Sequence, residues 1–352
     1  SGSSGSYARE ALRNGLELNA AGAGNPYRFG FIGSTDTHVG GGALREDRYF
    51  SKAGVQDGLP RRRGSVPANW FIGTVARWLS EDLVKEVDGR TYMAANVFEY
   101  WGASGLAAVW AESNTRESIY AALRRREAFA TSGPRIRLRF FAGLEFPPGL
   151  IADPGLIGKA YATGVPMGGE LAGEGTAPPE FLIWALADEA SAPLDRVQVI
   201  KGWEAGGKSF EKVFDVACSG NGVVDPATQR CPDNGAWVSA EDCSIPPDIG
   251  ARELKVQWQD PEFSPQQPAF YYVRVLENPT CRWSTWDALR AGVPPRSDLP
   301  RTIQERAWSS PIWYSPVGGG GQGAAAAGAG RQPQQSVPDG GGAGPVRFAR
   351  AR

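Results

Sequence analysis

The sequence predicts two structural classes in one chain, an α/β segment over residues 1–132 and an all-β, sandwich-like domain over residues 133–316. Glycine contributes 46 and proline 27 of the 352 residues, which is too many turn formers for a helical bundle. Before residue 133, short apolar runs alternate with helical periodicity, as in an α/β layer or barrel. After it, short alternating runs separated by turns indicate a β-sandwich.

The α/β segment opens with a predicted helix over residues 6–19, with Ser6 as its N-cap. Its apolar spacing is carried by Ala8, Ala11, Leu12 and Leu16. After a Gly/Ala-rich linker, the apolar residues 29–33 lead into the polar residues 34–38. Such a transition is typical of a buried parallel strand that delivers side chains to a site at its C-terminal end.

Residues 39–67 predict a long loop rich in glycine and arginine, and loops of this length are usually functional or mobile. Residues 105–110 then predict a short buried strand. A second helix follows, with Asn114 as its cap and Glu117 at the third helical position.

The second segment shows the polar and apolar alternation of half-buried strands. We expect strands at residues 135–140, 181–186, 197–200, 212–216, 254–258, 270–276 and 310–314. Residues 317–352 are of low complexity, and we expect them to form a disordered tail because they cannot bury enough apolar surface.

Charge and hydropathy exclude two classes of partner. Lys and Arg number 37 against 38 Asp and Glu, a net charge of −1 that argues against a general nucleic-acid-binding surface. The chain lacks a run of 18 apolar residues, so we expect no membrane span. The chain begins at Ser1 and its first Met is Met93, which we interpret as a fragment or a processed chain without a visible signal peptide.

The cysteines form an even, clustered set, which favours two disulfides over reduced thiols or a metal site. Their spacings do not match a CxxC zinc pattern, and the three possible pairings remain open. Disulfides would place the protein in the periplasm or outside the cell. The four residues are Cys218, Cys231, Cys243 and Cys281.

Asp36 and His38 are the strongest chemical motif. In an extended segment residues i and i+2 point to the same side, so this pair could ligate a divalent metal or act as an oriented general base. A structural pair on a loop is the alternative. His38 is the only histidine, so further ligands would have to be carboxylates or residues upstream of this chain.

Six stretches resemble one known family, in the order in which that family carries them. They are residues 25–38, 105–115, 124–135, 194–203, 270–288 and 305–314. The likeness is to the C-terminal half of a bacterial family catalogued as domain of unknown function 3604. That family is similar to the PHP (polymerase and histidinol phosphatase) metal-dependent hydrolases.

This resemblance implies that residues 1–132 are the C-terminal part of a distorted (β/α) PHP-like barrel. Asp36 and His38 map onto the Asp-x-His of its last strand and would hold a divalent ion such as zinc, manganese or iron. The family's early His-x-His element has no counterpart here, so this chain alone is expected to be inactive. The turn at Thr131 and Ser132 matches the link from barrel to sandwich and could face the site.

Two functions from different classes therefore compete. The first is a metal-dependent hydrolase in which a metal-bound hydroxide attacks a small-molecule ester or phosphoester, with Arg45 and Arg48 stabilising an anionic substrate. The second is a secreted binding or structural sandwich without catalysis. Its tryptophans would either form a carbohydrate platform or pack in the core. An inactive fragment with exposed apolar edges is a third possibility, and the oligomeric state is not predicted.

Overall fold

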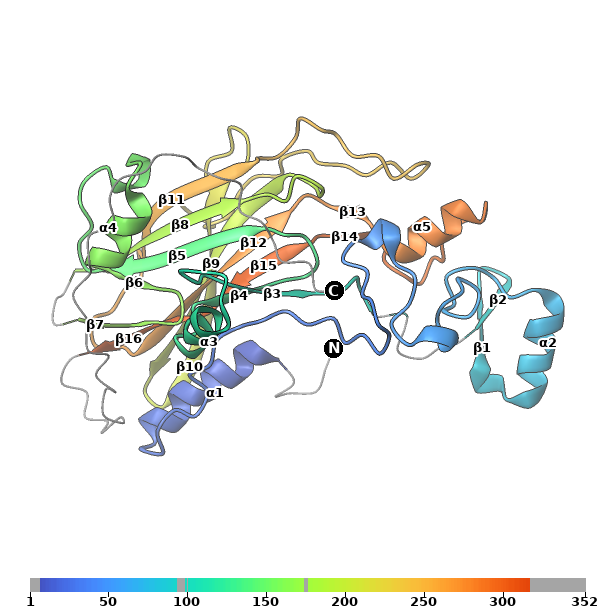
Figure 1. Ribbon diagram of the computed structural model, residues 1–352, viewed down its shortest axis with the longest axis horizontal. Helices are drawn as coiled ribbons and strands as arrows, with labels where there is room; N and C mark the ends of the chain where they lie inside the picture. The colour runs from blue at the N-terminus through green and yellow to red at the C-terminus, as the bar shows by residue number, and fades with distance from the viewer. Residues whose placement is uncertain (1–6, 94–98, 100, 174–176, 317–352) are drawn as a thin grey trace. The chain divides into compact units, whose positions relative to one another are not determined.

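Two β-sheets packed face to face form the body of the protein, seen in a computed structural model that describes residues 7–93, 99, 101–173 and 177–316 (Figure 1). In these residues the larger sheet has eight strands, and its main path runs β10-β9-β12-β15-β4-β3. In that order the bounds are Lys208–Cys218, Leu194–Ala205, Ala269–Glu277, Arg306–Ser309, Ala128–Thr131 and Leu106–Val109.

The last described strand, β16 (Ile312–Pro316), completes the larger sheet. It pairs antiparallel with β12 and parallel with β7 (Glu170–Gly173). The smaller sheet has the order β11-β8-β5-β6. Its strands are Glu253–Gln259, Glu180–Leu186, Arg137–Gly143 and Val165–Pro166.

The core lies between the sheets, where alternate residues of each strand point inward. Phe140 on β5 stacks on Phe181 on β8 with ring centroids 5.8 Å apart, and Phe181 lies 4.6 Å from the ring of Tyr271 on β12. These contacts join the two sheets. All seven strands expected between residues 135 and 314 are present, because inward-facing apolar residues alternate with outward-facing polar ones.

Helices cover the outer face of each sheet. Helix α1 (Ala8–Ala20) places Leu12 and Leu16 in one cluster with Phe270 and Trp313 of the larger sheet. Helix α4 (Leu156–Thr163), preceded by the short 3₁₀ helix η5 (Leu150–Ala152), packs on the smaller sheet. The expected helix over residues 6–19 is thus present, although Tyr7 rather than Ser6 is its N-cap.

The expected (β/α) barrel is wrong, because the chain forms mostly antiparallel sheets with few helices. β3 arises where a buried strand was expected, and α3 (Arg116–Arg124) follows with Thr115 as its cap. However, β4 then returns antiparallel to β3, with Ala107 opposite Ala130. Residues 29–33 form no strand, and Gly33 merely donates a backbone hydrogen bond to Leu106.

The strands on either side of residue 133 do not test the expected domain boundary. β4 and β5 lie on either side of the expected boundary at residue 133, in different sheets. The boundary at residue 133 stays a prediction. The expected disordered tail at 317–352 lies outside the described residues.

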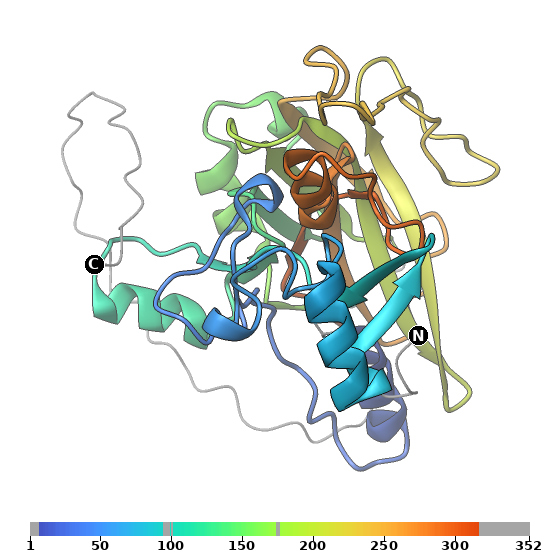
Figure 2. The ribbon, with the colours of Figure 1, turned by 90° about the vertical axis from the view of Figure 1, so that its right-hand side faces the viewer.

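A small lobe follows the long loop and was not expected. Helix α2 (Trp70–Leu79) and the 3₁₀ helix η3 (Glu81–Leu83) lead into a hairpin of β1 (Val84–Val87) and β2 (Arg90–Met93) (Figure 2). Near the opposite end of the sequence, β13 (Thr280–Cys281) pairs with β14 (Thr302–Ile303), and α5 (Trp283–Arg290) lies between them.

Candidate functional site

Asp36 and His38 are both exposed, in a segment without regular secondary structure. Asp36 has a φ of 48°, a left-handed conformation that is uncommon outside glycine and that is concentrated at functional sites. The Nδ1 atom of His38 lies 3.1 Å from the backbone oxygen of Asp36. Since a carbonyl only accepts, Nδ1 is the donor in this contact, which leaves Nε2 for a second partner.

Lys52 connects this pair to the interior. Its backbone oxygen accepts a hydrogen bond from the His38 backbone amide at 2.7 Å, and its side chain is buried. Burial lowers the pKa of the Lys52 ammonium, whereas the nearby charges of Asp36, Glu46 and Asp57 act against that shift. The Lys52 side chain therefore interacts by charge with both Asp36 and the buried Glu46, and its Nζ lies over the ring of Trp101.

The long loop that carries Lys52 is anchored on α5. The ring of Tyr49 stacks on Trp283 with centroids 4.8 Å apart, and Arg63 forms an ion pair with Asp287. Glu46, in the 3₁₀ helix η1 (Glu46–Arg48), accepts a hydrogen bond from the Trp283 amide at 2.7 Å. A second turn, η2 (Gly54–Gln56), lies within the loop. The loop is therefore held by buried polar contacts along much of its length.

The structure places the other expected site residues in different surroundings. Arg45 forms a two-point contact with Asp47, at 2.8 and 2.9 Å, while Arg48 is exposed. The hydroxyl of Ser132 donates to the carboxylate of Glu305. Thr131 is buried. Its hydroxyl accepts a hydrogen bond from the backbone amide of Gly133, a contact that is typical of turns.

A cavity of about 300 Å³ brings several of these groups together. We call it the acidic cavity, and its lining includes Arg45, Glu46, Asp188, Ser191, Trp286 and Glu305. Ser132 borders it through Glu305, whereas Asp36 and His38 are not among its lining residues. The expected metal pair and the expected substrate arginine Arg45 therefore do not share one cavity.

Three buried carboxyl groups have raised pKa values, of which Glu46 and Glu305 line the acidic cavity and Glu277 lies behind its lining residue Ser191. Burial raises the pKa of Glu305 to about 7 against the hydrogen bond from Ser132. Burial, with the charges of Glu305 and Asp188, raises the pKa of Glu277 to about 8. Glu277 accepts a hydrogen bond from the hydroxyl of Ser191. The pKa of Glu46 is also raised by burial. Such perturbed groups in a cavity are typical of functional sites.

The cysteines form two disulfides, as expected. Cys218 is bonded to Cys231 and Cys243 to Cys281, with Cα atoms 5.6 Å apart in each pair. The second disulfide lines the acidic cavity. Disulfides are typical of proteins that fold outside a reducing cytoplasm.

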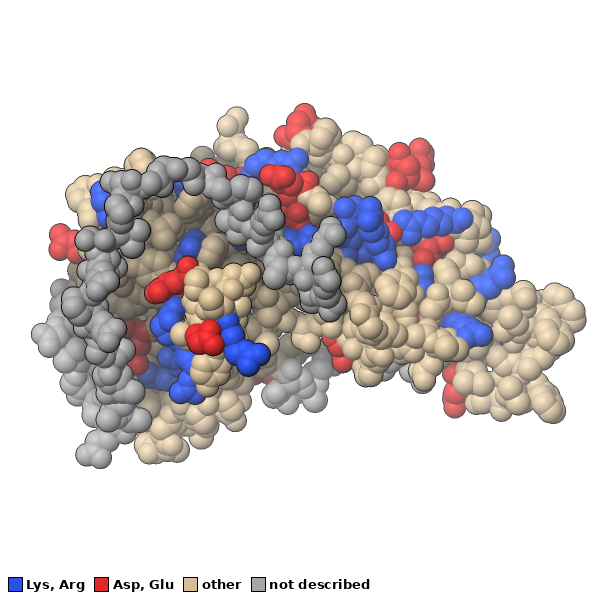
Figure 3. Space-filling view, in the orientation of Figure 1, with Lys and Arg blue, Asp and Glu red and all other residues tan. Residues whose placement is uncertain are grey.

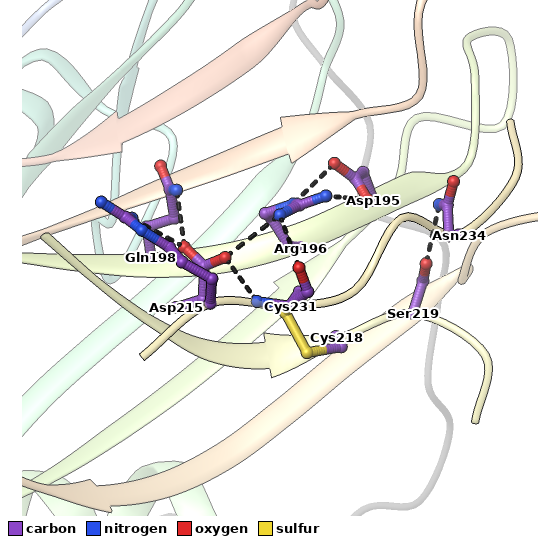
Figure 4. Close-up of a disulfide and its surroundings, with 9 residues drawn as sticks. Asp195, Arg196, Gln198, Asp215, Cys218, Ser219, Cys231 and Asn234 are labelled. Carbon is purple, nitrogen blue, oxygen red and sulfur yellow. Dashed lines mark hydrogen bonds and ion pairs between the residues drawn. A yellow bond between two sulfur atoms is a disulfide. The ribbon is translucent and has the colours of Figure 1, made fainter. Parts of the chain in front are cut away.

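The first disulfide lies beside a second cavity, of about 360 Å³. Around this disulfide, the carboxylate of Asp215 accepts hydrogen bonds from Arg196, Gln198 and the amide of Cys231 (Figure 4). Asp195, which lines this cavity, is already paired with Arg196. These charges are satisfied within the protein, so we assign this network to holding the disulfide loop on β9 and β10.

Three sequence-based expectations concern a metal site, a surface row of tryptophans and a membrane-spanning helix. Within the described ranges, no group of three or more His, Cys, Asp or Glu residues could hold a metal ion. None of the tryptophans considered for a carbohydrate platform is exposed, so they form no open row of indoles. These residues are Trp203, Trp258, Trp283, Trp286, Trp308 and Trp313. Among the helices that the structure describes, none has the length and hydrophobicity to cross a bilayer.

The fold and the sites thus define a disulfide-bonded β-sandwich protein with an acidic cavity and, outside that cavity, an exposed Asp-x-His pair. Residues 1–316 match the family described as "Protein of unknown function (DUF3604)", and the chain belongs to that family. Neither a curated protein nor a solved structure was found to match the chain.

Sequence reasoning missed the carboxyl groups in and beside the acidic cavity. Glu46 lies in the long loop, and Glu277 and Glu305 lie more than 200 residues further along the chain. No spacing rule connects positions so far apart. The one local signal is that β12, a mostly apolar strand, ends in Glu277.

Proposed function

We propose that the protein contributes to a metal-dependent hydrolase that acts on a small-molecule ester or phosphoester, and that Asp36 and His38 are metal ligands. The observation that carries this proposal is the 3.1 Å contact between Nδ1 of His38 and the backbone oxygen of Asp36. When Nδ1 donates to this carbonyl, the Nε2 atom of the exposed ring is left to bind a metal. A bound divalent ion such as zinc, manganese or iron would lower the pKa of a water molecule and polarise the substrate.

The residues present fit this role in part. A carboxylate and a neutral imidazole are a donor set that zinc, manganese and iron all accept. Two ligands do not complete a site, so further ligands would come from the substrate or from residues that the structure does not describe. The Lys52 ammonium is close enough to Asp36 to interact with it by charge, and it would orient this carboxylate.

Substrate binding is assigned to the neighbouring arginines and to the acidic cavity. Arg45 lines the cavity and Arg48 is exposed next to it in sequence, so both are candidates for contacting an anionic group. Glu305, with a pKa of about 7, could donate or accept a proton near neutral pH. We further propose a periplasmic or extracellular location, supported by the two disulfides.

The test is metal content and hydrolysis, measured on the purified protein after loading with zinc, manganese or iron. The variant combines Asp36→Ala with His38→Ala, and the matched control is Glu112→Gln, which alters an exposed carboxylate between β3 and α3. We expect the double variant to lose bound metal and turnover of an aryl phosphoester, and the control to keep both. Unchanged metal occupancy in a double variant that melts like the parent would contradict the assignment.

The acidic cavity favours a second candidate function, a secreted binding module without catalysis. Acidic groups outnumber the basic Arg45 among its charged lining residues, so a small organic cation is the ligand that its charge favours. We expect 1,4-diaminobutane to raise the melting temperature and neutral 1,4-butanediol to leave it unchanged. The shift should disappear in Asp188→Asn, which removes one lining carboxylate. Equal responses to both compounds would contradict this candidate.

A further inference from the structure

Helix α2 presents its large apolar side chains to solvent instead of to the protein. Trp70 is 80% exposed, Phe71 62%, Trp78 83% and Leu79 64%. Ile72, Val75 and Leu83 are also exposed, and we call these seven residues the α2 face. In the orientation of Figure 1, the region around α2 shows few charged atoms (Figure 3).

The inner side of the helix explains why the large residues point outward. Gly73 and Ala76 are the buried residues of α2, and a Cβ at Gly73 would lie 3.2 Å from Thr91 on β2. Only small side chains fit against the hairpin. The usual arrangement, with large apolar residues inward and polar residues outward, is therefore reversed.

The size of the α2 face matches a specific interface. From the exposed fractions, its seven side chains present on the order of 800 Å² of apolar area. Each partner contributes about 800 Å² to a protein interface of standard size. A patch this large on a folded protein usually marks a binding surface.

We propose that the α2 face binds the α2 face of a second copy of this chain, with the two helices antiparallel about a two-fold axis. At about 100° per residue, Phe71, Val75, Trp78 and Leu79 fall on one side of the helix. Antiparallel pairing about Val75 puts Phe71 of each copy opposite Leu79 of the other. Val75, the smallest of the four, lies on the axis, where close approach of the helices requires a small side chain.

Charge complementarity supports the same pairing. Glu81 and Asp82 follow the C-terminal end of α2 and are exposed. In an antiparallel pair these carboxylates lie beside the N-terminal end of the other copy's helix, where the helix dipole is positive. A parallel pair would bring the acidic ends of the two copies together. The antiparallel arrangement therefore satisfies both the apolar contacts and the charges.

The same charges argue against a lipid surface as the occupant. Peripheral helices that bind membranes carry Lys and Arg on their polar side. Here the lobe formed by residues 69–93 contains four acidic residues, Glu81, Asp82, Glu86 and Asp88, against Arg77, Lys85 and Arg90. This lobe offers no basic excess to an anionic bilayer, whereas a second copy requires none.

The decisive experiment is analytical ultracentrifugation of the parent protein, Val75→Lys and Tyr120→Lys. Val75→Lys places two ammonium groups at the axis, and Tyr120→Lys adds the same charge at a 61% exposed residue of α3. We expect parent and control to be dimers at about 100 µM, and Val75→Lys to raise the dissociation constant at least about tenfold. A monomeric parent, or a dimer that survives Val75→Lys, would overturn the proposal.

A cross-linking variant gives a second, independent readout. Val75→Cys should form a disulfide-linked dimer under mild oxidation, because the two side chains face each other across the axis, whereas Tyr120→Cys should not. Flotation with phosphatidylcholine and phosphatidylglycerol vesicles tests the lipid alternative. Flotation of the parent that is lost in Val75→Lys would overturn the dimer, and absence of flotation together with cross-linking of the Val75→Cys variant would support it.

Discussion

The guanidinium of Arg63 and the carboxylate of Asp287 form a two-point ion pair, with both nitrogen-to-oxygen distances at 2.7 Å, although 224 residues separate them in sequence. Both side chains are buried, and the hydroxyl of Ser65 donates a further hydrogen bond to Asp287 at 2.6 Å. This pair fixes the long loop to α5 and thereby positions the wall of the acidic cavity.

Removal of one partner of this ion pair should lower the free energy of unfolding strongly. Arg63→Ala leaves the Asp287 carboxylate buried without its cation, and we expect a loss of about 3–5 kcal/mol in the free energy of unfolding. Arg45→Ala, which breaks an exposed pair on the same loop, should change stability by about 1 kcal/mol or less. Urea denaturation monitored by tryptophan fluorescence measures both. Equal effects of the two variants would show that the buried pair does not anchor the loop.

Stability should fall as the pH rises from about 5 to 8. The pKa of Glu277 is raised to about 8 and that of Glu305 to about 7, so in this range the folded protein binds more protons than the unfolded chain. The stabilisation from keeping these groups neutral is fully present below their unfolded pKa, near 4.5, and is lost as the pH passes through the folded values.

Glu277→Gln isolates this effect, because the amide has nearly the shape of the carboxyl group and does not ionise. We expect a flatter dependence of melting temperature on pH, with the largest gain in stability at pH values above 8. Glu253→Gln, an exposed carboxylate on β11, should keep the parent's pH profile. A Glu277→Gln profile that parallels the parent would mean that Glu277 is ionised throughout.

The two disulfides should contribute different amounts to the free energy of unfolding. Replacement of Cys243 and Cys281 by serine removes a link between residues 38 positions apart, whereas the other disulfide links residues 13 apart. Loss of either should cost about 2–5 kcal/mol, and loss of the longer link about 1 kcal/mol more through chain entropy. Calorimetry of the two double variants measures the difference. A larger loss for Cys218 and Cys231 would point to strain or packing instead of chain entropy.

Gly202 should not tolerate a side chain. A Cβ at this position on β9 would lie 2.1 Å from Cζ of Phe270, which is fully buried on the neighbouring strand. We expect Gly202→Ala to cost about 1–3 kcal/mol in the free energy of unfolding. Gly40→Ala, where nothing lies within 4 Å, should stay within about 1 kcal/mol of the parent. Chemical denaturation that shows no difference between the two would mean that the ring of Phe270 moves aside.

The strands of the sandwich could be predicted because alternation is a local signal. Residues such as Leu138 and Phe140 point inward and their neighbours outward, and that pattern is visible in the sequence. The barrel was an error of the same local reasoning. A short apolar run followed by a capped helix is common to both topologies, and only the pairing of β3 with β4 distinguishes them.

Longer-range features were not accessible from sequence patterns. Asp36 and His38 were visible because they are two residues apart, and their metal-binding role stays a prediction. Helix α2 gave no clear signal, because its large apolar residues face solvent and its inner side is made of Gly73 and Ala76. Buried partners such as Arg63 and Asp287 are set by tertiary packing alone.

The packing of α1 against the last described strand has a consequence for biosynthesis. Leu12 and Leu16 are buried in one cluster with Trp313, so the apolar side of α1 has no complete binding site until β16 has left the ribosome. At about 5–20 residues per second, the intervening roughly 300 residues take about 15–60 s to synthesise. During that interval the apolar side of α1 is exposed, so the nascent chain is a substrate for chaperones well before its sheets can close.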